Sequence, residues 1–154
     1  MYDIKRLQQL AGINPQQLEE GWKEVMFVGA LALSNLLGGS LKAQNIADIS
    51  NVSNKDKTEI LNRNANEKKE FYAILVGALA EMAERMGSNK TIEELNALKE
   101  ARIYFENLRD GITPTPLSKL AEIAVNHVLK VLKSFPGEKL KQLAEKGKNL
   151  KTYM

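Results

Sequence analysis

Phe-Val-Gly-Ala-Leu-Ala, at residues 27–32, returns as Leu-Val-Gly-Ala-Leu-Ala at residues 75–80. Each copy places a glycine inside an apolar run of helical spacing, where glycine costs about 1 kcal/mol relative to alanine. Two glycines in matching places indicate that another helix packs closely against each run. The small residues expected at these helix crossings are Gly29, Ala32, Ala73, Gly77 and Ala80.

The sequence around the repeat predicts an all-α protein, because no β-branched run alternates apolar and polar residues as a half-buried strand does. We expect an antiparallel bundle of about four main helices with short flanking helices. The polar run 62–66 is a weak helix former and can interrupt the second main helix. The main helices are expected at about 15–37, 53–87, 91–111 and 117–135, and the short ones near 3–12, 41–49 and 138–145.

One start signal, one stop signal and one apolar face give specific predictions. Thr91 with Glu94 forms a capping-box pattern, and Gly111 is the expected stop of the same helix. In the last main helix, one apolar stripe is expected to face the core. Its members are Leu120, Ile123, Ala124, Val128, Val131 and Leu132.

The chain is divided by composition into a helical domain at 1–135 and a basic C-terminal helix and tail at 136–154. From residue 117 onward there are eight lysines and three acidic residues. Such an end can hold nucleic acid, an anionic lipid surface or an acidic partner, or it can be a solvated helix face.

No catalytic, cofactor-binding or metal-binding motif can be written from the sequence. The chain has no cysteine and one histidine, His127, which lies on or next to an apolar stripe and is expected to be a core or boundary residue. The paired carboxylates lie on polar faces beside lysine and arginine, where burial does not separate their pKa values. We therefore expect neither an enzyme nor a small-molecule substrate.

Residues 25–41 carry no charge and need testing as a membrane segment. The run is shorter than the roughly 20 residues that a spanning helix needs. Ser34, Asn35, Gly38 and Gly39 also interrupt it. We interpret it as a buried core helix and do not expect a membrane protein.

Residues 46–62 resemble the helix-turn-helix of repressor-type DNA-binding domains. Ile46 and Ala47 fit the first helix, Asn51 fits the left-handed turn position, and Lys57 departs from the pattern by occupying a place that is normally a buried aliphatic residue. The resemblance implies that Asn54, Lys55 and Thr58 face base edges or phosphates. A corner of this shape without DNA binding remains the alternative.

The first 13 residues, with Asp-Ile-Lys-Arg-Leu-Gln-Gln-Leu at 3–10, resemble the opening of small proteins of marine tailed bacteriophages. The resemblance implies a virion or assembly component that packs against copies of itself or other particle proteins, in the host cytoplasm or the virion. We therefore expect a non-enzymatic structural or interaction protein with protein partners, a homo-oligomer or a larger assembly. DNA binding through residues 46–62 and the basic C-terminus is the alternative.

Overall fold

The computed structural model describes residues 20–37, 46–47, 49, 51–86 and 91–152. Within these residues the regular structure is helical and no strand is present, which confirms the predicted all-α fold class. The helix expected at 3–12 and most of the one at 41–49 lie outside the described residues. The described helices are α2 (Glu20–Leu37), α3 (Asn54–Arg63), α4 (Ala65–Met86), α5 (Ile92–Arg109), α6 (Lys119–Leu132) and α7 (Gly137–Lys148).

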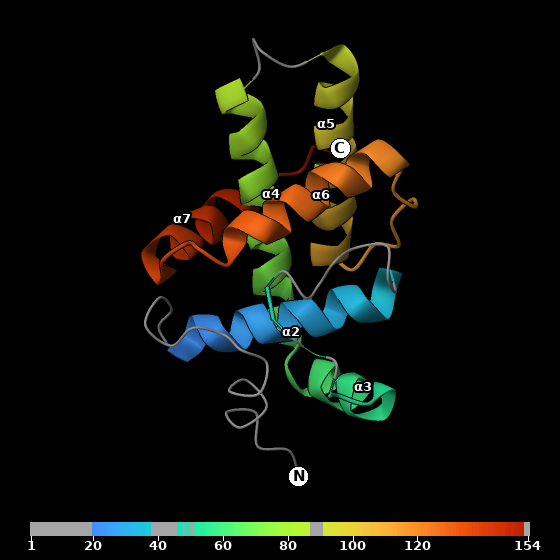
Figure 1. Cartoon of the computed structure of the whole chain (residues 1–154), viewed down its shortest axis with the longest axis vertical. Coiled ribbons are helices and arrows are strands. Elements are labelled where there is room, and N and C mark those ends of the chain that lie inside the picture. The colour runs from blue at the N-terminus through green and yellow to red at the C-terminus, as the bar shows by residue number, and fades with distance from the viewer. Residues whose placement is uncertain (1–19, 38–45, 48, 50, 87–90, 153–154) are drawn as a thin grey trace.

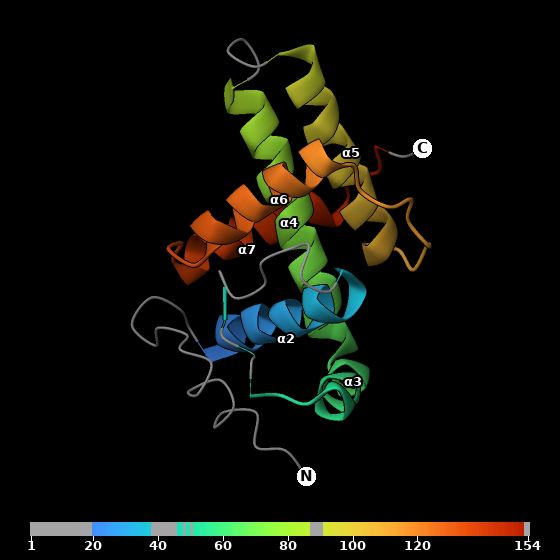
Figure 2. The same cartoon turned by 45° about the vertical axis from the view of Figure 1, so that its right-hand side comes forward.

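Helix α4 is the centre of the fold. It forms an antiparallel hairpin with α5; α6 and α7 cross it at about the same level, and α2 crosses it nearer its N-terminal end (Figures 1 and 2). Because α4 contacts all the other described helices, it is buried on every side between residues 71 and 80. The second copy of the repeated sequence falls within this buried stretch.

The expected interruption of the long helix occurs at Asn64. Its backbone leaves the helical region (φ −120°, ψ 46°), and its side-chain Nδ2 donates to the Ile60 carbonyl at 2.7 Å. Asparagine competes in this way with the helix's own hydrogen bonds. The chain therefore turns between α3 and α4, which sends α3 along α2 instead of continuing the line of α4.

The ends of α5 follow the sequence signals. The Thr91 hydroxyl oxygen accepts from the Glu94 backbone N–H at 3.1 Å, and its own proton goes to Glu94 Oε1 at 3.2 Å. At the other end Gly111 has φ +78°, a left-handed conformation that favours glycine. The Ile112 N–H then donates to the Asn107 carbonyl at 2.8 Å, closing a Schellman motif.

Helix α2 is the buried helix that the sequence predicts. Residues 25–33 have no exposed position, and Phe27, Leu31 and Leu33 are completely covered. None of the described helices combines the length and the apolar character that crossing a membrane requires.

The stripe expected to be buried on α6 is wrong at two of its positions. Ile123 is 61% exposed and Leu120 is 42% exposed, whereas Ala121, Val125 and Leu129 are buried instead. Apolar residues cover a broad sector of α6. The centre of the expected stripe lies about 100° around the helix from the centre of the buried one, and Val128 and Leu132 belong to both. Periodicity identifies both faces as apolar and does not say which one meets the core.

Helix α7 extends to Lys148, beyond the expected end near residue 145, and lies along α4. Its buried residues are Gly137, Leu140, Leu143, Ala144 and Gly147. The basic C-terminal segment is therefore packed on the central helix of the fold.

Candidate functional site

An apolar groove runs along one side of α6, in the angle where α6 crosses α4 and α5. It consists of two adjoining cavities of about 500 Å³ and about 240 Å³. Met82 of α4 and His127 of α6 line both of them. We call the two together the α6 groove.

The larger cavity lies between α4, α5 and the N-terminal half of α6. Ala97 and Leu98 of α5 form its far wall, and Leu120, Ile123 and Ala124 form the α6 side. Among the described residues of its lining, the charged side chain is Glu94. The exposed face of α6 thus lies at the edge of a cavity whose walls are almost entirely apolar.

The smaller cavity lies between α4, α7 and the C-terminal half of α6. Val128, Val131 and Phe135 supply its apolar wall on the α6 side. Its charged rim is made by Glu81, Arg85 and Lys139.

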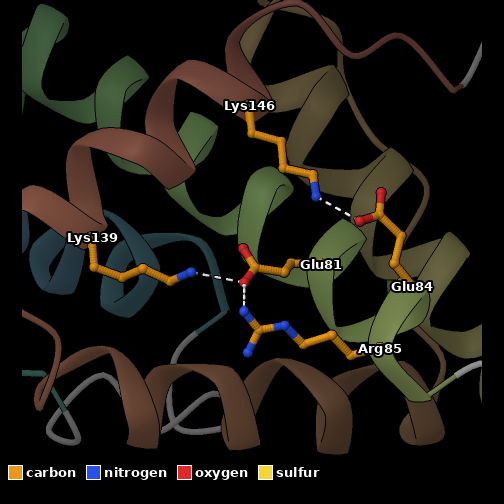
Figure 3. A network of polar contacts seen from close by, with 5 residues as sticks. All are labelled: Glu81, Glu84, Arg85, Lys139 and Lys146. Carbon is orange, nitrogen blue, oxygen red and sulfur yellow. Dashed lines mark hydrogen bonds and ion pairs between the residues drawn. The ribbon is translucent and has the colours of Figure 1, made fainter.

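An ion-pair network forms this rim (Figure 3). Lys139 Nζ lies 2.7 Å and Arg85 Nη2 lies 2.5 Å from Glu81 Oε1. The hydrogen bond from Lys139 is the main reason that the pKa of Glu81 falls below its usual value; partial burial opposes the shift, and the charges of Lys139, Arg85 and Lys146 add to it. Lys146 makes a second bridge to α4, 2.7 Å from Glu84 Oε2. The network ties α7 to α4 and leaves the rim of the smaller cavity with more positive than negative side chains.

Among the other large apolar residues, the exposed ones lie apart from the groove. Ile92 is 77% exposed, and Leu36 and Ile112 are also exposed, yet none of the three lines either cavity. Single exposed apolar side chains are ordinary on protein surfaces. Leu120 and Ile123 differ because they adjoin a cavity with further apolar walls, which is typical of a protein contact surface.

The repeated glycines lie at two different helix crossings. A Cβ atom on Gly29 would lie 2.6 Å from Phe71 Cδ2, where α2 crosses α4. A Cβ atom on Gly77 would lie 2.9 Å from the Leu143 carbonyl carbon, where α4 meets α7. The two glycines therefore have different partners. Of the accompanying small residues, Ala32, Ala73 and Ala80 are all buried.

A third glycine, which is not among the small residues predicted from the sequence, completes the α4–α7 crossing. A Cβ atom on Gly147 would lie 2.7 Å from the Gly77 backbone nitrogen and would also overlap the Ala73 carbonyl oxygen. The backbones of α4 and α7 meet here without side chains between them. The signal available was the pair Ala144 and Gly147, two small residues three apart in a lysine-rich helix.

Two buried polar residues of α5 hold the end of α7. Arg109, buried at the last turn, donates from Nη1 to the Gly147 carbonyl and from Nε and Nη2 to the Asp110 carboxylate, at 2.8 Å each. Glu106 is completely buried and accepts from the Thr152 backbone N–H. These contacts secure the C-terminal segment against α5, and no sequence pattern indicated them.

The helix-turn-helix interpretation of residues 46–62 does not match the described geometry. The backbone at Ile46, Ala47 and Ile49 is not helical, and Asn51 does not take the left-handed conformation. Lys57, the misfit in the pattern, reaches back to α2, where its Nζ donates to Ser34 Oγ at 2.9 Å. This part of the chain is shaped by the packing of α3 on α2.

The three proposed DNA contacts are nevertheless accessible. Asn54, Lys55 and Thr58 are exposed on the first turns of α3, and Thr58 Oγ1 donates to the Asn54 carbonyl at 3.1 Å. Of the C-terminal lysines, Lys139 and Lys146 are held in ion pairs with α4.

His127 was expected at a core or boundary position; its exposure excludes the core position, and its side chain lines both cavities. Within the part of the chain that the structure describes, no group of three histidine or acidic side chains is placed to hold a metal ion.

Comparison with protein-family models, curated proteins and solved structures finds no match to this chain.

Proposed function

We propose that this chain is a non-enzymatic helical interaction protein that receives a helix of a protein partner in the α6 groove. The observation that carries the proposal is the exposed apolar face of α6, with Ile123 61% exposed beside a cavity of about 500 Å³. Exposing such a face to water is unfavourable, at about 25 cal/mol per Å² of apolar surface. A partner that covers it gains this free energy on binding.

The shape of the groove favours a helical occupant. From Leu120 to Val131 it follows α6 for about 16 Å, which is about three turns of a second helix. Its walls are apolar and its charges lie at the rim, the arrangement that receives the apolar stripe of an amphipathic helix.

The titratable side chains of the groove support a binding role more than a catalytic one. Glu81 is held between Lys139 and Arg85, and its lowered pKa keeps it ionised and unable to donate a proton near neutral pH. Glu94 is occupied by its capping contacts with Thr91. As part of the same proposal, the N-terminal resemblance suggests that the partner belongs to a larger assembly such as a tailed-phage particle.

Site-specific photocrosslinking in the native host tests this function. A p-benzoylphenylalanine at position 123 should give a covalent protein adduct, and the same group at position 92 should not. Ile92 is the matched control because it is as apolar, more exposed and outside the groove. Equal adducts at both positions, or none at 123, would contradict the proposal.

DNA binding is the second candidate, and the exposure of Asn54, Lys55 and Thr58 favours it. It predicts duplex retention at low salt that falls steeply as salt rises. It also predicts that Lys55→Glu weakens retention while Ile123→Glu does not. If wild-type protein retains no duplex at low salt, this candidate is eliminated.

A further inference from the structure

We infer that the occupant of the α6 groove is α6 of a second copy of this chain, running antiparallel across a two-fold axis at His127. The inference rests on the proposed function and names its partner. His127 is the natural centre because it lines both cavities, with the larger one on its N-terminal side and the smaller one on its C-terminal side.

The two-fold register matches each exposed apolar residue with an apolar wall. In an antiparallel pair centred on residue 127, position 127 − n of one copy faces 127 + n of the other. Ile123 of one copy therefore faces Val131 of the second, which lines the smaller cavity there. The two-fold axis repeats this contact. Ile123 of each copy therefore faces the smaller cavity of the other copy, as in an isologous interface.

The charges of the groove are complementary under the same operation. Among the described residues, the larger cavity is lined by the acidic Glu94, whereas the smaller one is lined by Arg85 and Lys139 around the acid Glu81. In the antiparallel register, Lys130 of one copy, which is exposed, faces Ala124 of the other, beside the cavity that contains Glu94. The basic half of each groove thus lies over the acidic half of its partner, which favours this pairing over others.

A parallel pairing of the same helices lacks this complementarity. It would bring Lys130 of one copy beside Lys130 of the other, and Lys119 beside Lys119. Like charges directly opposite each other are unfavourable. The antiparallel arrangement is therefore the one that both the apolar and the charged residues of the groove support.

A cysteine on the axis tests the inference with the purified full-length chain. The chain has no cysteine of its own, so His127→Cys introduces a single thiol that faces its own copy. A disulfide requires Cα atoms within about 7 Å, a separation that positions on a two-fold axis meet readily. Mild oxidation should give a covalent dimer of twice the 17.2 kDa chain mass for His127→Cys. The matched control Ile92→Cys, whose thiol lies outside the groove, should form no disulfide-linked dimer under the same oxidation.

A second variant checks that the groove, and not chance collision, makes the dimer. Ile123→Glu in the His127→Cys background should abolish the crosslink and raise the dimer dissociation constant about a hundredfold, since the change occurs at two symmetric contacts. Ile92→Glu should leave both unchanged, and helical circular dichroism should be the same for all variants.

The results of these experiments distinguish dimer formation through α6 from the proposed binding of a partner helix. A chain that stays monomeric by light scattering, or that forms disulfides equally at positions 127 and 92, overturns the second copy as occupant. A photocrosslink from position 123 to a different protein overturns it as well, while leaving the proposed function intact. If neither the disulfide at 127 nor the adduct at 123 forms, both are overturned.

Discussion

Helices α6 and α7, the last two described helices of the chain, both cross α4, yet α7 packs closely against it and α6 leaves an apolar face exposed. Lysine-rich α7 lies against α4 with backbone touching backbone at Gly77 and Gly147, and its end is held by buried Arg109. Apolar α6 leaves Leu120 and Ile123 in water beside an open groove. Apolar content alone therefore does not tell how closely a helix approaches α4, because close approach depends on small residues at the crossing.

The largest expected effect concerns the backbone contact of α7. Gly77→Leu should lower the free energy of unfolding by about 3 kcal/mol, because its Cβ would meet the Leu143 backbone, which cannot move aside as a side chain can. Urea denaturation followed by circular dichroism measures the change. A loss below about 0.5 kcal/mol, the range of ordinary surface substitutions, would mean that α7 does not pack here.

The next effect concerns the clamp at the end of α7. Arg109→Met keeps the apolar length of the side chain and removes its hydrogen bonds to Gly147 and Asp110. We expect a loss of about 2 kcal/mol, since hydrogen bonds from charged groups contribute more than neutral ones. Hydrogen exchange should show faster exchange of α7 amides relative to α4. Unchanged protection of α7 would contradict this account of the clamp.

A smaller effect is expected at the rim network. Because the pKa of Glu81 is lowered in the folded protein, its ion pairs stabilise the fold above the usual glutamate pKa, and the contribution is lost as pH falls through the folded value. Glu81→Gln should cost about 0.5 kcal/mol near neutral pH, as expected for partly exposed ion pairs. The cost should vanish at low pH. A cost that is independent of pH would assign the effect to packing.

The smallest effect on stability is expected on α6. Ile123→Glu should change the free energy of unfolding by no more than about 0.5 kcal/mol, because the side chain is exposed in the single chain. The measurement must be made at dilutions where the chain is monomeric. A loss of 2 kcal/mol or more would mean that this face of α6 belongs to the core, and the contrast with α7 would disappear.

Local signals in the sequence predicted the helix ends well. The Thr91 cap, the Gly111 stop and the interruption within residues 62–66 depend on neighbours three or four positions away. Such contacts are readable from the chain because they form within one turn.

Contacts between distant segments could not be predicted in this way. The apolar pattern of α6 assigned Leu120 and Ile123 to the core, since two adjacent apolar faces give the same helical period. The pattern at 46–62 suggested a DNA-binding corner, but the hydrogen bond from Lys57 to Ser34 depends on where α2 lies. The described residues of the α6 groove come mainly from α4, α5, α6 and α7, so only the folded arrangement brings them together.

Photocrosslinking at one position on each of the two helices decides whether α6 or α7 provides the contact surface for a partner. With p-benzoylphenylalanine at position 123 of α6 or position 141 of α7, both exposed in the fold, the account predicts a protein adduct from 123 and none from 141. An adduct from 141 alone would contradict it and would make the basic helix the contact surface.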